Sequence, residues 1–167
     1  LHINSINAKM SLNELTKIGK EKIDIDAFTI NGVKANLISN EDGVTNFDIA
    51  KKGKEEKEES SAKNKDEGND LKLKVAEYGI LNTNIDYLDE ATGTHLQILD
   101  FNHIGAGDLA NDVVDLDTET SMKLSLDQEE TNILTNYNVT LDAILNIDNK
   151  NKKYTFKENK LLVNRLG

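Results

Sequence analysis

The feature that most constrains this chain is a long stretch in which apolar and polar residues alternate. From position 114 to 126, the even positions carry aliphatic, Met or Thr side chains, and the odd positions carry Asp, Glu, Ser or Lys. Side chains point alternately to the two sides of an extended strand, so this pattern places the two sets on opposite faces. At about 3.3 Å per residue, the stretch would span roughly 43 Å, well beyond the usual strand. It predicts a long β-strand with one apolar face.

Further alternating stretches predict the partners of this strand. After the polar segment 127–131, residues 133–147 alternate in the same way. A polar turn at 148–152 leads to a third alternating stretch at 153–157, and a separate short strand is expected at 161–166. The C-terminal half should therefore be a run of antiparallel strands joined by short turns.

The N-terminal half carries shorter strands separated by turn signals. Asn31-Gly32, flanked by apolar residues, is typical of a type I′ hairpin. The segment Asn40-Glu41-Asp42-Gly43 predicts another turn. Residues 44–49 fit either a strand or the first turn of a short helix capped by Asn46. Both possibilities stay open.

An offset of 50 residues brings apolar positions of two segments into correspondence. The matched pairs are Ile23 with Leu73, Ile25 with Val75, Phe28 with Tyr78, Ile30 with Ile80, Ala35 with Ile85, Leu37 with Tyr87, and Gly43 with Gly93. An internal repeat would produce these matches, but so would strand alternation at any even offset. The two explanations remain equally open.

Local composition divides the chain into three parts. Residues 1–50 form a β segment, with a short helix near 11–19 predicted by the capping-box spacing of Ser11 and Glu14. Residues 51–70 are rich in Lys and Glu and contain no side chain larger than Ala to bury, so they predict a charged flexible linker or loop. Residues 71–167 form a C-terminal antiparallel segment. We expect one sheet system overall.

Overall composition excludes several classes of function. The chain has 20 Lys and Arg against 30 Asp and Glu, and this net charge of −10 disfavours nucleic-acid binding. It has no Cys, which excludes disulfides and thiolate metal sites. No apolar run approaches the roughly 20 residues of a membrane-spanning helix. The chain begins at Leu1 rather than Met, and we expect it to be a piece of a longer protein.

No group of residues predicts a catalytic, metal or cofactor site. His2, His95 and His103 are isolated in the sequence and lack the spacing of metal ligands. The acidic row on the odd positions between 115 and 119 is expected from strand alternation alone. We therefore expect a protein that is not an enzyme and binds no cofactor.

The remaining distinctive feature is an apolar strand face with almost no helix to cover it. Exposing apolar surface costs about 25 cal/mol per Å², so something should cover this face. A second sheet, the rest of the parent protein, a partner or a lipid-like ligand could do so. Elementary physics alone favours the self-covering β-sandwich. The apolar strip predicted on the long strands consists of Leu116, Met122, Leu124, Leu141, Ala143 and Leu145.

Two segments resemble AsmA-type bacterial envelope proteins. The sequence IDYLDEATG at 85–93, followed by LQILDFNH at 96–103, is similar to a Y-x-D-x-x-T-G segment and the strand after it in that family. The sequence ANLISNEDGVTNFDI at 35–49 resembles its x-x-D-G-x-x-N-[WF]-D passage, which precedes a variable charged linker. The resemblance spans roughly 23–166.

The resemblance implies a periplasmic protein of the bridge-like lipid-transfer superfamily. Such proteins are held in the inner membrane by a segment outside this chain and serve outer-membrane assembly and lipid transport between membranes. The implied fold is a mainly β, antiparallel structure with long one-sided strands in a curved open sheet or sandwich-like groove, and one or two short helices. The implied partners are a phospholipid or other acyl-chain lipid, which would lie on the apolar strip, and the remainder of the parent chain.

A second hypothesis comes from another functional class. The chain could be a surface β-sandwich that serves adhesion or carbohydrate binding. Sugars stack on aromatic rings, so this hypothesis calls for an aromatic cluster on a polar face, whereas lipid binding calls for a continuous aliphatic strip. Tyr87, Tyr154 and Phe156 share their parity with aliphatic neighbours. The sequence therefore favours lipid.

Overall fold

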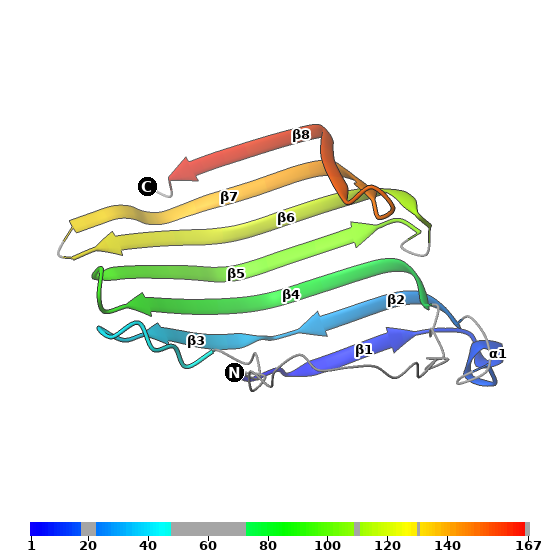
Figure 1. Ribbon diagram of the computed structural model, residues 1–167, viewed down its shortest axis with the longest axis horizontal. Helices are drawn as coiled ribbons and strands as arrows, with labels where there is room; N and C mark the ends of the chain where they lie inside the picture. Colours follow the sequence, from blue (N-terminus) through cyan, green and yellow to red (C-terminus); the bar gives the residue numbers. More distant parts are fainter. Residues whose placement is uncertain (18–22, 48–72, 109–110, 130, 166–167) are drawn as a thin grey trace, which may run out of the picture.

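The computed structural model of the chain shows one open β-sheet with a short helix at one corner (Figure 1). It describes residues 1–17, 23–47, 73–108, 111–129 and 131–165. The strands are β1 (Ser5–Lys9), β2 (Ile23–Asn31), β3 (Lys34–Ser39), β4 (Leu73–Asp89), β5 (Thr94–Ala106), β6 (Val113–Gln128), β7 (Thr131–Asp148) and β8 (Lys153–Arg165). The helix α1 spans Leu12–Leu15. No helix within the described ranges is long and apolar enough to cross a bilayer.

The strands follow the order β1-β2-β4-β5-β6-β7-β8, with β3 beside the second half of β4. Neighbours are antiparallel except for β2 and β3, which run parallel to β4. The predicted fold class, mainly β with long antiparallel strands in a curved open sheet, is confirmed. All strands of the described residues belong to a single sheet, so they do not form a β-sandwich.

The longest hairpin has the predicted partners and faces. β6 pairs with β7 along nearly their whole length, with Leu116 opposite Leu145 and Met122 opposite Val139. Laterally paired residues project from the same side of a sheet, so the alternating apolar positions of both strands share one face. The register thus places the predicted strip on a single face.

The 50-residue offset proves to be the lateral register of a parallel pairing. Ile25 lies beside Val75 in neighbouring strands, and Leu37 lies beside Tyr87. The turns that follow also correspond, because Gly43 and Gly93 both have a positive φ, at 74° and 63°. After the second turn the chain forms β5 along β4. After the first turn, Thr45 makes a single bridge to Ser39.

The predicted hairpin at Asn31-Gly32 is wrong. β2 and β3 continue in the same direction on either side of it, and both pair with β4. Gly32 does adopt a positive φ of 71°, but its N–H donates to the Leu81 carbonyl at 2.9 Å, so the chain stays beside β4. Gly32 serves as a bulge within one long strand path rather than as a reversal.

Asn and Asp residues mark a belt of bulges across the sheet. Asn82 in β4 and Asp100 in β5 have φ values of 51° and 50°, and the strand registers shift around them. Asn and Asp tolerate this left-handed conformation better than other residues with side chains. Asn82 donates through its side chain to Asn31 and through its backbone to Asn102, both at 3.0 Å. These bonds tie three neighbouring strand paths together where the ladder is irregular.

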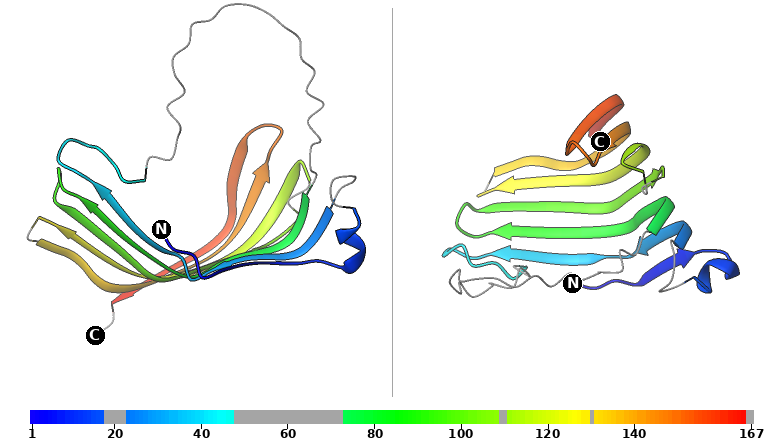
Figure 2. Two further views of the ribbon diagram at one scale, coloured as in Figure 1. Left: turned by 90° about the horizontal axis from the view of Figure 1, so that it is seen from below. Right: turned by 45° about the vertical axis from the view of Figure 1, so that its right-hand side comes forward.

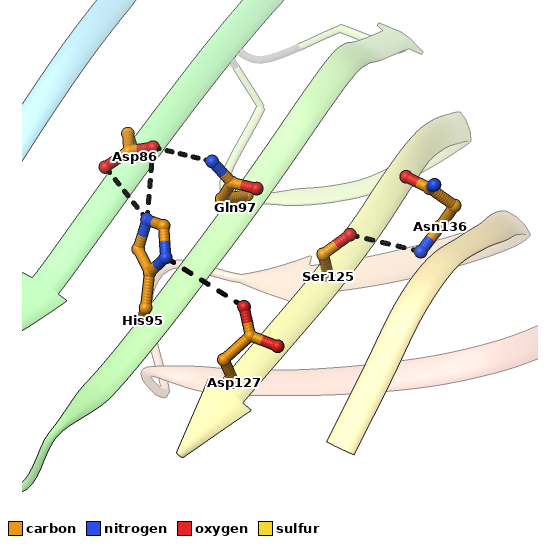
Figure 3. A network of polar contacts seen from close by, with 6 residues as sticks. All are labelled: Asp86, His95, Gln97, Ser125, Asp127 and Asn136. Carbon is orange, nitrogen blue, oxygen red and sulfur yellow. Dashed lines mark hydrogen bonds and ion pairs between the residues drawn. The ribbon is translucent and has the colours of Figure 1, made fainter. Parts of the chain in front are cut away.

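The strands bend so that the sheet forms a trough, as Figure 2 shows. Figure 3 views the outer side of this bend, where Gln97, Ser125 and Asp127 project. Their sequence neighbours Leu96 and Leu124 point the opposite way, because side chains alternate along a strand. The aliphatic face is therefore the concave face of the trough, and the acidic face is the convex one.

The helix signal is only partly realised. α1 covers Leu12–Leu15, with Ser11 at its N-cap, and the Ser11 side chain makes no capping hydrogen bond. Glu14 does not reach back as a capping box requires. It accepts from the Asp24 backbone N–H at 3.0 Å and from Lys17 Nζ at 2.7 Å, and is nearly buried. Glu14 thus fastens α1 to β2.

The last strand is longer than predicted. The two expected pieces at 153–157 and 161–166 are parts of one strand, β8, which pairs with β7 from Lys153 to Arg165. The register skips at Lys157, because Leu145 lies opposite Phe156 and Ile144 opposite Glu158. This bulge reverses the parity of the apolar positions, which made one strand resemble two.

Some predictions fall outside the described residues. These are the charged segment 51–70, the end of the helix expected near 11–19, and the last two residues of 44–49. Within 44–47, Asn46 accepts from the Ile38 N–H at 2.9 Å and donates to the Asn36 carbonyl at 3.1 Å. Asn46 thus contacts β3 through its side chain.

Candidate functional site

The candidate site is the apolar floor, by which we mean the aliphatic and aromatic side chains on the concave face of β4 to β8. Rows of paired residues run across it from strand to strand. One row passes from Leu116 to Leu145 and on to Phe156, and another from Met122 to Val139 and Val163. The floor is thus continuous across the C-terminal strands as far as the sheet edge.

The six residues predicted from sequence all lie on this floor, but their exposure differs. Leu116 and Ala143 are buried, with only 3% and 4% of their surface exposed. Met122, Leu124, Leu141 and Leu145 are half-buried. Crowding on the inner side of a bend explains how a single layer buries some side chains. Four of the six residues are therefore partly accessible, whereas Leu116 and Ala143 are not.

The floor has no covering layer among the described residues. No large side chain of the described residues is fully buried. A closed core between two layers would contain such side chains. The one aromatic contact made by the segment after β3 is between Phe47 and Tyr87, whose ring centroids are 6.3 Å apart in an edge-to-face arrangement. As far as the described residues go, the floor is therefore apolar surface without a second layer over it.

A short chain of polar side chains interrupts the floor. The Tyr78 hydroxyl lies 3.0 Å from Nε2 of His103, and Nδ1 of His103 lies 2.9 Å from the Thr120 hydroxyl. Gly105 lies opposite Tyr78 in β5, and a Cβ there would come within 2.5 Å of the Tyr78 ring. The missing side chain of Gly105 thus lets the Tyr78 ring lie across β5 and reach His103.

Burial controls the protonation of this polar chain. Desolvation lowers the pKa of His103 below its ordinary 6.5, because burial disfavours the charged imidazolium. Desolvation also raises the pKa of Tyr78 above its ordinary 10.0, because burial disfavours the phenolate. At neutral pH the Tyr78–His103–Thr120 chain is therefore uncharged, which suits its place in an apolar floor.

The convex face carries the other notable polar cluster (Figure 3). His95 Nε2 lies 3.2 and 3.3 Å from the carboxylate oxygens of Asp86, and Nδ1 lies 4.0 Å from a carboxylate oxygen of Asp127. Gln97 donates to Asp86 at 2.9 Å. The nearby Ser125 hydroxyl accepts from the Asn136 backbone N–H at 3.1 Å. No hydrogen bond joins Ser125 to His95, so the cluster lacks the nucleophile–base contact of a hydrolase.

The acidic row of β6 lies on the same convex face and is solvated. Asp115, Asp117 and Glu119 are all exposed. Lys157 reaches from β8 to both carboxylate oxygens of Asp115 at 2.7 Å, and this hydrogen bond, with a second from Asn146, lowers the pKa of Asp115. No group of three or more potential metal ligands occurs within the part of the chain that the structure describes.

Comparison with known proteins gives no relative. No protein-family model matches the chain, and neither a curated protein nor a solved structure matches it.

The polar chain on the floor is not evident from the sequence. His103 is isolated there, and its partners Tyr78 and Thr120 lie 25 and 17 residues away. The signal that could have found them was parity. Tyr78 and Thr120 both occupy apolar-face positions of their strands, but only the register of β4, β5 and β6 brings all three together.

Proposed function

We propose that the chain binds acyl chains of lipids along its apolar floor, as a part of an AsmA-like envelope protein that serves lipid transport and outer-membrane assembly. The observation that carries the proposal is an apolar floor, interrupted only by the Tyr78–His103–Thr120 chain, on the concave side of the one sheet that the described residues form. Burial of such a surface against hydrocarbon is favourable, non-directional and proportional to area. A flat floor of this kind suits chains of different lengths and needs no specific head-group contact.

The proposal places the protein in the periplasm, held at the inner membrane by a segment outside this chain. It is not an enzyme in this proposal, and the floor would be one section of a longer path. The motifs at 35–49 and 85–103 support this placement through their likeness to AsmA-type proteins. The open trough agrees with it, since a lipid path needs an apolar surface that is not closed by a second layer.

Adhesion or carbohydrate binding remains the second candidate. Its support would be an aromatic cluster on a polar surface, where rings can stack on sugars. Tyr87, Tyr154 and Phe156 instead lie in register with Leu96, Ile147 and Leu145 on the concave face. The aromatic residues thus add to the apolar floor, which favours the lipid proposal.

A binding assay with a fluorescent phospholipid tests the proposal. We expect the purified chain to take up a phospholipid with a labelled acyl chain. Phospholipids with choline and with glycerol head groups should bind about equally. Leu124→Gln on the concave face should weaken binding several-fold. Leu99→Gln is the matched control, because Leu99 is partly exposed on the convex face, and it should leave binding unchanged.

Circular dichroism of both variants checks that each remains folded. Absence of phospholipid binding by the folded chain without substitutions would contradict the proposal. So would an equal loss in both variants. Binding to immobilised glycans with no response to lipid would support the second candidate instead.

A further inference from the structure

The feature that gives the floor a specific contact point is the polar chain of Tyr78, His103 and Thr120. Its three side chains come from β4, β5 and β6, and all three are half-buried on the floor. Covering polar groups with hydrocarbon costs free energy unless they have hydrogen-bond partners. How far the three groups satisfy one another therefore decides what a lipid on the floor has to supply.

The polar chain has one more hydrogen than it has internal hydrogen bonds. The two hydroxyls and the neutral imidazole each carry one hydrogen, and two contacts join them, at 3.0 and 2.9 Å. A proton on Nδ1 of His103 is donated to Thr120, which leaves the Thr120 hydrogen unused. A proton on Nε2 is donated to Tyr78, which leaves the Tyr78 hydrogen unused. Among the described residues neither hydroxyl makes a further hydrogen bond, so one O–H donor is spare in both cases.

The surroundings of His103 keep this polar chain uncharged. In the row of laterally paired residues, His103 lies between Ile80 and Thr120, and Leu141 follows. Phe101 stacks on the His103 ring at a centroid distance of 6.3 Å. No charged side chain of the residues that the structure describes lies in this row, and desolvation lowers the pKa of His103. The spare donor is therefore a neutral O–H group.

A neutral donor on an apolar surface favours a neutral acceptor. The carbonyl oxygen of an ester is such an acceptor, because it brings no charge that has to leave water. A phosphate group, or the carboxylate of a free fatty acid, would lose its water without gaining a cation in this row. The ester also stands at the head of an acyl chain. A lipid held there by its carbonyl would lay its hydrocarbon over the neighbouring apolar rows.

Burial along β6 sets the direction of that hydrocarbon. On one side of Thr120, the floor position Thr118 is buried, with 6% of its surface exposed, and its hydroxyl donates to the Ala143 carbonyl at 2.9 Å. On the other side, Met122 and Leu124 are half-buried. An acyl chain that begins at Thr120 therefore finds accessible apolar surface in the direction of Leu124.

We propose that the spare O–H group of the polar chain donates to the ester carbonyl of an acyl-glycerol lipid, whose hydrocarbon lies over Met122 and Leu124. This inference rests on the proposed function, because it requires a lipid on the floor. It adds the class of lipid, namely one with ester-linked acyl chains. Choline and glycerol phospholipids share this ester, so the contact agrees with equal binding of the two head groups.

Competition between two lipids that differ only at the ester tests the inference. Diester and diether phosphatidylcholine have the same head group and the same chain length, but the diether lacks the carbonyl oxygens. Each is used to displace the fluorescent phospholipid from the purified protein. We expect the diester to bind about 3- to 10-fold more tightly, which is the scale of one hydrogen bond. Equal affinity would overturn this inference alone, whereas no binding of either lipid would overturn the proposed function as well.

A variant without the polar chain tests where the preference arises. Removing one hydroxyl alone also removes one internal bond and leaves a spare donor, so Tyr78→Phe, His103→Phe and Thr120→Val are combined. All members become apolar groups of similar shape, which leaves no unsatisfied partner and should keep the fold, as circular dichroism checks. This triple variant should bind both lipids equally. Thr140→Val is the matched control, since Thr140 pairs with Ser121 on the convex face, and it should keep the preference for the diester. A preference that survives in the triple variant would overturn the inference.

Discussion

The middle of the sheet and its β8 edge carry the same alternating pattern but bury it to very different degrees. Leu116 in β6 and Phe156 in β8 belong to one row across the concave face, yet Leu116 is 3% exposed and Phe156 is 59% exposed. In a single layer, a side chain is covered mainly by neighbours on the same face. β6 has neighbours on both sides, whereas β8 pairs with β7 alone among the strands that the structure describes.

This difference shows what alternation can and cannot predict. Period-two patterning identifies the face on which a side chain lies, because it follows from backbone geometry. It does not predict burial, which depends on the place of the strand in the sheet and on the bend.

The largest effect is expected from a charge in the middle of the floor. Leu116→Asp would bury an unpaired carboxylate between β5 and β7, and we expect a loss of about 3–5 kcal/mol in the free energy of unfolding. Phe156→Asp at the edge should cost less than about 1 kcal/mol, because water reaches the carboxylate. Chemical denaturation at low protein concentration, followed by circular dichroism, measures both. Equal losses would remove the contrast between middle and edge.

The bulge belt can be tested at Asp100. Asp100→Val would place a β-branched residue at a φ of 50°, and we expect it to cost about 2 kcal/mol of stability. Asp117→Val is the matched control, because Asp117 has extended backbone on the same convex face, and it should be near neutral. Asp100→Gly should be tolerated, since Gly accepts positive φ. A tolerated Asp100→Val would show that the backbone at position 100 is not held in this left-handed conformation.

A smaller effect is expected from substitution of two glycines in neighbouring strands, Gly79 in β4 and Gly105 in β5. Gly105→Ala would drive a methyl group against the Tyr78 ring and should cost about 1–2 kcal/mol. Gly79→Ala is the comparison, since its added Cβ would make ordinary contacts at 3.5 Å or more, and it should be neutral or slightly stabilising. Thermal unfolding of the two variants measures the difference. If both cost the same, the Tyr78 ring does not lie against Gly105.

The smallest effect concerns pH and the polar chain on the floor. Because the pKa of His103 is lowered in the folded state, the unfolded chain binds the proton more readily. Stability should therefore fall as the pH drops below 6.5, before carboxylates with ordinary pKa values near 4 titrate. His103→Gln should remove this part of the pH dependence. Denaturation midpoints measured across this range check it, and an unchanged profile in the variant would contradict the assignment.

Much of the fold was predictable from the sequence. The alternation around Leu116 and Leu141 predicted the β6–β7 hairpin and its apolar face, because a strand's side-chain period is fixed. Asn31-Gly32 misled because a positive φ serves a hairpin and a bulge equally well, and only the position of β4 distinguishes them. The bulges at Asn82 and Asp100 could not be predicted, because they depend on the alignment of strands that are distant in the sequence.

The candidate site was predictable to a similar extent. The apolar strip followed from parity, but the burial of Leu116 and Ala143 depends on the bend. The polar chain at His103 depends on three strands meeting in one register, which parity within a single strand cannot supply. Glu14 had capping-box spacing, yet the nearby Asp24 N–H competed for its carboxylate.

The most direct test of the central claim is site-specific photo-crosslinking in cells that express the chain in its natural context. The claim is that the concave floor contacts lipid and the convex face does not. Crosslinkers at Leu124 and Leu141 should capture phospholipid, and crosslinkers at Asp117 and Asp142 on the convex face should not. Equal labelling of both faces, or labelling of neither, would contradict the claim that the floor is a lipid-binding surface.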